Sequence, residues 1–179
     1  MALTSTVYNF DIDLADSDRG VYETLALRLA RHPSESDEFL VARLLAYCLE
    51  YTEGIEFSRG GLSDPDAPPL VVRDLTGALR AWIEIGTPAA DRLHRASKAA
   101  PRVAVYAHKE SAQWLAGVRA AKIHRAESLE LYALDRPLVH TLAARLDRRM
   151  AFALGVSDRE VFISLADATL TGAVERLHL

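Results

Sequence analysis

The sequence predicts a single mixed α/β domain that spans residues 1–179. Segments in which apolar and polar residues alternate, as in strands, occur between segments with the spacing of helices. A chain of 179 residues is long enough for one domain with its own core, and no internal repeat, low-complexity tract or linker divides it. Half of the residues are hydrophobic and 26% are charged, as in ordinary globular proteins.

The N-terminal segment is predicted to form one strand and two helices. The sequence YNFDIDL at residues 8–14 alternates, which predicts a half-buried antiparallel strand. Ser17 is a suitable N-cap for a helix with Val21, Tyr22, Leu25 and Leu29 on one side. Ser34 is the predicted N-cap of a second helix, which is acidic in its first turn. Beyond Phe39 this helix is apolar nearly all round, so we expect it to be central.

The middle of the chain is predicted to hold a hairpin and a basic helix. A short strand over residues 54–57 leads into a loop rich in Gly, Pro and Asp over 58–69. Residues 70–86 predict two strands joined near Thr76-Gly77. Thr87 and Pro88 suit the N-cap and first turn of a helix that extends to residue 100.

The C-terminal half predicts a strand over 102–107, a helix over 111–121, a strand over 128–134 and a helix over 136–146. The strand–helix–strand order suggests a parallel pair with a right-handed crossover. Three further strands within residues 150–174 are expected to form an antiparallel meander. These terminal strands either pair with each other or extend one edge of the central sheet.

Charge and composition narrow the possible classes of function. The net charge of −4 argues against a general affinity for nucleic acid or membranes, although a local basic patch fits it. The single cysteine, Cys48, excludes an intramolecular disulfide. The N-terminus does not resemble a signal peptide, and no apolar run reaches transmembrane length. We therefore expect a cytoplasmic protein without a membrane partner.

Two carboxylates around the predicted hairpin form a candidate site. Asp74 ends the first strand and Glu84 lies between two isoleucines of the second, where an ionised carboxylate is costly unless it is paired. In a tight hairpin the two would lie on neighbouring strands, and Mg²⁺ often binds through one or two carboxylates. The alternative is that each acid is solvated or paired with a local arginine, such as Arg73 or Arg80.

Several motifs resemble the YaeQ family, a bacterial group whose fold resembles that of the PD-(D/E)XK nucleases. They are LARHPSES at residues 29–36, EFLVARLLAY at 38–47, EFSRG at 56–60, WIEIGTP at 82–88 and VAVY at 103–106. The resemblance runs over most of the chain. It implies a restriction-endonuclease-like core with additional antiparallel strands from both termini.

The resemblance also implies a site that binds Mg²⁺ or Mn²⁺. Asp74 resembles the Asp of the nuclease motif, Glu84 its second acid, and Glu35 or Glu38 the extra helix glutamate of many members of the superfamily. The motif has Lys two residues after the second acid, whereas this chain has Gly86.

The basic helix offers replacements for the missing lysine. Arg92 and Arg95 are candidates for binding phosphate, and Lys98 is the candidate proton-transfer group, since Arg stays protonated in proteins. Arg43 is expected to satisfy a buried carboxylate, in the site or elsewhere. The alternative is that the helix cations form only a solvated face.

Three functions are open at this point. The first is a weak metal-dependent nuclease or phosphodiesterase that uses Asp74, Glu84 and Lys98. The second is a non-catalytic module that keeps the nuclease-like fold and binds nucleic acid, through the local basic helix, or protein. The third is a metal-dependent enzyme with a smaller substrate. Gly86 and the negative net charge favour the second.

Overall fold

The computed structural model describes residues 4–58 and 66–179, which contain four α-helices, one 3₁₀ turn and ten strands. The helices are α1 (Asp37–Leu49), α2 (Ala90–Ala99), α3 (Ala112–Ala120) and α4 (Arg136–Ala144), with the 3₁₀ turn at Ala126–Ser128. The strands are β1 (Thr6–Asp16), β2 (Val21–Arg31), β3 (Ile55–Phe57), β4 (Leu70–Arg73), β5 (Leu79–Ile85), β6 (Arg102–Ala107), β7 (Glu130–Leu134), β8 (Arg149–Ser157), β9 (Glu160–Ser164) and β10 (Thr169–Leu177). The predicted mixed α/β class is confirmed, while residues 59–65 of the predicted loop lie outside the described part.

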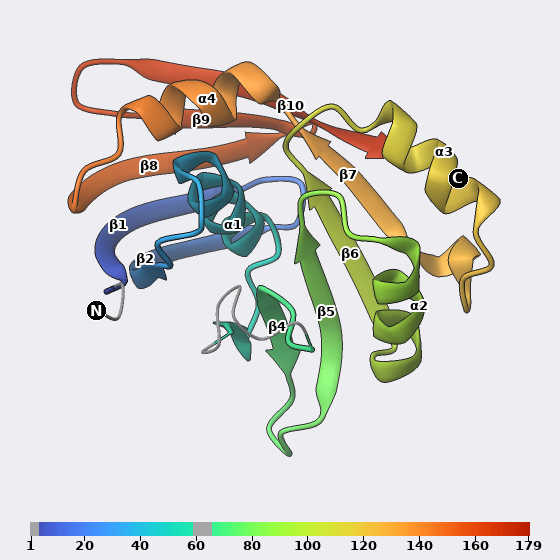
Figure 1. Cartoon of the computed structure of the whole chain (residues 1–179). Helices are drawn as coiled ribbons and strands as arrows, with labels where there is room; N and C mark the ends of the chain where they lie inside the picture. The colour runs from blue at the N-terminus through green and yellow to red at the C-terminus, as the bar shows by residue number, and fades with distance from the viewer. Residues whose placement is uncertain (1–3, 59–65) are drawn as a thin grey trace.

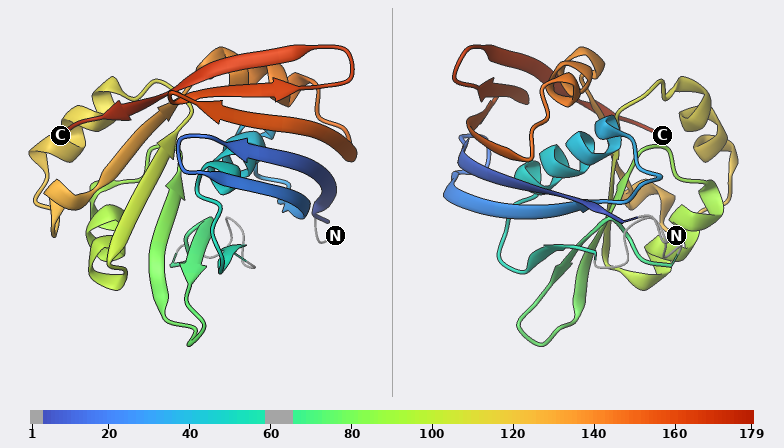
Figure 2. Two further views of the ribbon diagram at one scale, coloured as in Figure 1. Left: turned by 180° about the vertical axis from the view of Figure 1, so that it is seen from behind. Right: turned by 60° about the vertical axis from the view of Figure 1, so that its left-hand side comes forward.

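The ten strands form one sheet in the order β2-β1-β8-β9-β10-β7-β6-β5-β4-β3. The pairs β5–β6, β6–β7 and β1–β8 are parallel, and the other neighbours are antiparallel. The sheet curves strongly and nearly closes on itself, as Figures 1 and 2 show. Both arrangements left open for the terminal strands occur: β8, β9 and β10 form a meander, and they join β1 to β7 within the same sheet.

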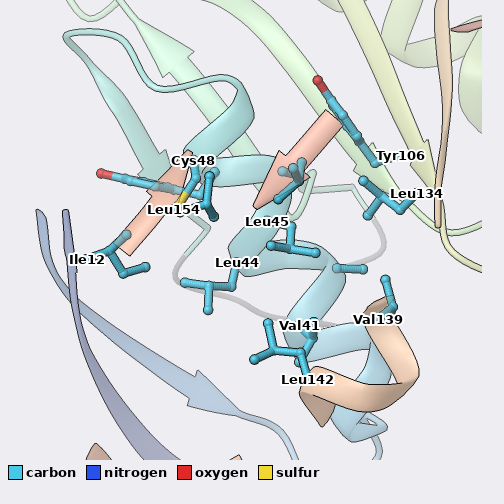
Figure 3. Packing of buried hydrophobic residues seen from close by; sticks show 14 of the residues in the cluster. Ile12, Val41, Leu44, Leu45, Cys48, Tyr106, Leu134, Val139, Leu142 and Leu154 are labelled. Carbon is cyan, nitrogen blue, oxygen red and sulfur yellow. The ribbon is translucent and has the colours of Figure 1, made fainter. Parts of the chain in front are cut away.

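Helices α1 and α4 lie on the concave side of this sheet, where the larger core is found (Figure 3). The buried side of α1 is almost its whole surface, and every residue from Leu40 to Cys48 is buried. It packs against side chains from β1, β6, β7, β8 and α4, among them Ile12, Tyr106, Leu134, Leu154, Val139 and Leu142. The expectation of a central helix is confirmed, because a helix that is apolar on all sides needs neighbours on all sides.

Helices α2 and α3 cover the opposite face of β5, β6 and β7 (Figure 1). A second core forms there from Trp82 on β5, Leu93 on α2, Val105 on β6 and Val118 on α3. Alternation along β5 separates the two cores, since Ile83 and Ile85 face α1 whereas Trp82 faces α2. No helix within the described ranges is long and apolar enough to cross a membrane.

The helix predicted after Ser17 is wrong, because residues 21–31 form strand β2. Leu25 and Leu29 lie four residues apart, a spacing that places two side chains on one side of a helix and also on one face of a strand. Eleven residues of β2 pair in antiparallel register with β1, from Thr6↔Arg31 to Asp16↔Val21. The long partner strand decides between the two readings.

Two predicted helix starts are also wrong by two residues. Ser36, and not Ser34, caps α1, since the Ser36 hydroxyl accepts a hydrogen bond from the amide of Phe39 at 3.1 Å. Helix α2 has Ala89 as its N-cap, so Thr87 and Pro88 precede the helix. The acidic first turn of α1 is confirmed, with Asp37 and Glu38.

Candidate functional site

Asp74 belongs to the turn of the β4–β5 hairpin. Its Oδ1 accepts hydrogen bonds from the amides of Thr76 at 2.9 Å and Ala78 at 3.0 Å, and from the Thr76 hydroxyl at 2.6 Å. The hydroxyl hydrogen bond is the main cause that lowers the pKa of the Asp74 carboxyl below its usual value. Asp74 is exposed and its side chain closes the turn, as short polar side chains commonly do.

Glu84 lies near the other end of β5 and is buried, with its side chain 4% exposed. Its Oε1 accepts hydrogen bonds from Arg92 Nε at 2.6 Å and from Trp82 Nε1 at 2.7 Å. Five residue steps separate Leu79, beside the turn, from Glu84, which is roughly 16 Å of strand. The two acids belong to one hairpin of paired strands, as expected, but they lie at its opposite ends and do not form the predicted cluster.

Arg92 explains how the chain tolerates a buried carboxylate on β5. Its guanidinium lies 6.0 Å from the centre of the Trp82 ring, and its NH2 donates to the carbonyl of Ala67 at 2.9 Å. One arginine on α2 thus contacts β5 and the segment that enters β4. The Glu84–Arg92 pair joins these three elements, so in this arrangement the carboxylate has a structural role.

The two glutamates near the start of α1 are paired elsewhere, on the concave side. Glu35 accepts from Arg43 NH2 at 3.1 Å, and both side chains are buried, as expected for an arginine that satisfies a buried acid. Burial raises the pKa of Glu35, and the guanidinium of Arg43 acts in the opposite direction. Glu38 is hydrogen-bonded to His140 Nδ1 at 3.0 Å. Neither glutamate joins Glu84.

The carboxylates predicted to hold Mg²⁺ or Mn²⁺ do not fit that role as they are arranged. A hard cation needs several oxygen ligands directed at one point, whereas the oxygens of Asp74, Glu84, Glu35 and Glu38 are directed at four different partners. Within residues 4–58 and 66–179, no three acidic, histidine or cysteine side chains gather in a way that could hold a metal. We therefore assign no chemical step to a metal ion.

The basic residues of α2 differ in how far they are exposed to solvent. Arg92 is mostly buried against Glu84, whereas Arg95 and Lys98 are exposed. Arg95 NH1 lies 3.3 Å from Asp66 Oδ1 in an exposed ion pair. Lys98 follows Arg92 by six residues, or about 9 Å along the helix axis, so its charge lies well beyond the Glu84–Arg92 pair.

Two residues near these sites were not among the predicted ones. Asp66 precedes β4 and pairs with α2, so it approaches the Glu84 end of the hairpin more closely than Asp74 does. The sequence feature that could have identified Asp66 is the dipeptide Pro65-Asp66, which matches the Pro-Asp at the start of the nuclease motif. His108 follows β6 and is buried, and neither ring nitrogen has a hydrogen-bond partner within the part of the chain that the structure describes. A lone histidine carries no sequence signal of that kind.

Comparison with known proteins identifies relatives over nearly the whole chain. Uncharacterised YaeQ proteins of Salmonella typhi and of Escherichia coli K12 are 33% and 32% identical over 165 residues, which are 92% of this chain and 91% of each relative. The crystal structure of the YaeQ protein from Xanthomonas axonopodis pv. citri superposes with a TM-score of 0.87 at 33% identity and covers 97% of this chain and 98% of that one. The YaeQ protein from Pseudomonas syringae gives the same TM-score at 32% identity, with 97% and 96% covered. The model of the YaeQ protein family matches residues 1–174, and the chain therefore belongs to the YaeQ family.

Proposed function

We propose that the protein is a non-catalytic module that keeps a nuclease-like core and binds nucleic acid. The core would be the α1–β3–β4–β5–α2–β6 segment, with β1, β2, β8, β9 and β10 as the additional strands. Two features support the loss of catalysis. The Glu84 carboxylate forms an ion pair with Arg92, and Gly86 is found at the position where the motif has lysine.

An uneven distribution of charge carries the proposal for nucleic-acid binding. Residues 90–129 contain eight Lys or Arg and only three Asp or Glu, whereas the remainder of the chain contains thirteen and twenty-two. A net positive segment within a net negative chain is the pattern expected when one surface binds a polyanion.

Helix α2 and the loop that follows α3 carry several of these cations, and the two elements are in direct contact. Arg125 donates hydrogen bonds to the carbonyls of Ser97 and, at 2.9 Å, Ala100, and the Ser97 hydroxyl donates to the carbonyl of His124. We call the exposed cations on this side the basic face: Arg95, Lys98, Lys122 and Arg125. Cations alone contact phosphates without reading bases, so binding would be independent of sequence and sensitive to salt.

Fluorescence anisotropy with labelled single-stranded DNA, duplex DNA and RNA tests this proposal. The Lys98→Gln/Lys122→Gln variant removes two exposed charges, and the Arg28→Gln/Arg149→Gln control removes two exposed charges from β2 and β8. We expect the first variant to bind more weakly. The slope of its log affinity against log salt concentration should fall by the amount that corresponds to about two phosphate contacts, while the control behaves as the wild type.

Equal binding by the variant and the control would contradict the assigned surface. If none of the three nucleic acids binds at low salt, nucleic-acid binding is excluded, and the alternative of a non-catalytic module that binds another protein is preferred. Cleavage of a substrate in Mg²⁺ or Mn²⁺ that is abolished by Glu84→Gln would contradict the non-catalytic assignment. A cytoplasmic location stays a prediction.

A further inference from the structure

An open pocket of about 940 Å³ lies where strand β6 ends and helices α1 and α4 begin. Its lining includes Glu38 from α1, the consecutive residues His108, Lys109 and Glu110 after β6, and Arg136 and His140 from α4. Strands β5, β6 and β7 are parallel, and ligands of α/β proteins commonly bind beyond the carboxyl ends of such strands.

His108 lines this pocket and is the residue whose surroundings are incomplete. It is 5% exposed, and neither Nδ1 nor Nε2 has a hydrogen-bond partner among the described residues. The ring packs edge-on against Phe39, with 6.1 Å between ring centres, and a Cβ added at Gly86 would lie 3.8 Å from its Cε1. A buried polar group without a partner costs free energy, so native proteins usually supply a water or a ligand.

The protonation of His108 favours a hydrogen-bonding role over a fixed charge. Burial, assisted by the nearby charge of Lys109, lowers the pKa of His108 below its usual value, while Glu38 acts weakly in the opposite direction. The neutral imidazole has one N–H donor and one nitrogen acceptor. It can therefore donate a hydrogen bond to an anion without carrying a charge that burial would oppose.

The rim of the pocket supplies positive charge that is only loosely paired. Arg136 NH1 lies 4.0 Å from Glu110 Oε2, and both side chains are largely exposed. His140 is held by Glu38 at 3.0 Å, and Lys109 is exposed beside His108. Exposed pairs of this length are weak, so an incoming anion can compete with them.

We propose that the His108 pocket binds a small molecule through an oxyanion, a phosphate or a carboxylate group, contacted by Lys109, Arg136 and a ring nitrogen of His108. Both ring nitrogens are shielded from solvent in the present arrangement, so contact with the anion requires the ring to turn about its side-chain bonds. This pocket is on the α1 and α4 side of the sheet, whereas the basic face is on the α2 side. The proposal is therefore independent of nucleic-acid binding.

Titration of protein labelled with ¹⁵N in its histidine rings tests the proposal. Inorganic phosphate and sodium acetate are added separately at constant pH and ionic strength, and the ring resonances are followed by long-range ¹H–¹⁵N spectra. We expect one of the two anions to shift the His108 resonance saturably in the millimolar range, which also decides between phosphate and carboxylate.

Two exposed substitutions keep the test independent of folding. The Lys109→Gln/Arg136→Gln variant should weaken anion binding about tenfold, as expected for the loss of charged hydrogen-bond donors, whereas the Arg28→Gln/Arg149→Gln control should not. The proposal is overturned if neither anion shifts His108 saturably, or if the two variants bind equally. A crystal grown with both anions that shows only an ordered water against His108 would also overturn it.

Discussion

Replacing Arg92 with Met tests whether the Glu84–Arg92 pair holds the fold together. The substitution keeps an apolar stem of similar length but leaves the Glu84 carboxylate, 4% exposed, without its guanidinium. Breaking a fully buried ion pair costs about 3–5 kcal/mol. Arg92 is 22% exposed and Trp82 still donates to Glu84, so we expect a smaller loss, about 2–3 kcal/mol of unfolding free energy.

The loss is measured by urea unfolding followed by circular dichroism, with thermal unfolding as a second readout. For a domain of this size, it corresponds to a fall in Tm of roughly 5–10 °C. Arg95→Met is the matched control, one turn further along the same helix. Its ion pair with Asp66 is 58% and 80% exposed, so its loss should stay within about 0.5 kcal/mol.

The Glu84→Gln/Arg92→Met variant completes the test. Glutamine still accepts a hydrogen bond from Trp82 but carries no charge, so the double variant should recover most of the stability lost in Arg92→Met. If Arg92→Met costs no more than Arg95→Met, the pair does not stabilise the fold. The Glu84 carboxylate would then be free for other chemistry, and the structural role argued above would be refuted.

Two further predictions concern the concave side of the sheet. A Cβ added at Gly172 would lie 2.6 Å from Asp135 Cβ and 2.8 Å from Leu138 Cβ. Gly172→Ala should therefore push α4 away from the sheet and lower the unfolding free energy, measured in urea, by about 1–3 kcal/mol. Gly117→Ala is the control, because a Cβ at Gly117 meets nothing within 4 Å and should not destabilise the protein. Because burial raises the pKa of Glu35 in the folded protein, its contribution to stability is present below its unfolded pKa and is lost as pH rises through the folded value. Unfolding free energies of Glu35→Gln should therefore rise relative to the wild type as the pH increases above the unfolded pKa of about 4.3, and a falling difference would contradict this assignment.

The sequence predicted those elements whose local pattern permits one interpretation. Strand β1 alternates strictly, with Phe10 and Ile12 among its buried residues, and the prediction was confirmed. Residues 21–31 permit two interpretations, since leucines four apart suit a helix and a strand equally. Only the pairing with β1, a tertiary contact, selects the strand, and one sequence does not reveal that contact.

The candidate site failed for a different reason. The hairpin was placed correctly near Thr76-Gly77, and from that turn Asp74 is two residues distant whereas Glu84 is seven. Counting from the turn would have separated the two acids along the strands. The resemblance brought them together, because a motif fixes the order of its residues but not the position of a turn between them. The pairing of Glu35 with Arg43, by contrast, follows from the rule that buried charges are paired. The sequence predicted that Arg43 pairs with a buried carboxylate, although it did not identify which one.

The position of β1 beside β8 has a consequence for how the protein is made. Asp18, in the turn after β1, accepts a hydrogen bond from the amide of Asp158, which lies 140 residues later in the chain. At 5–20 residues per second, the ribosome needs about 7–28 s to produce the strand that completes this part of the sheet. The N-terminal hairpin leaves the ribosome first, and the edge of β1 that pairs with β8 stays without its partner strand until then. An unpaired strand edge is a template for pairing with another chain, so during synthesis this edge of β1 is exposed to contacts that the finished sheet excludes.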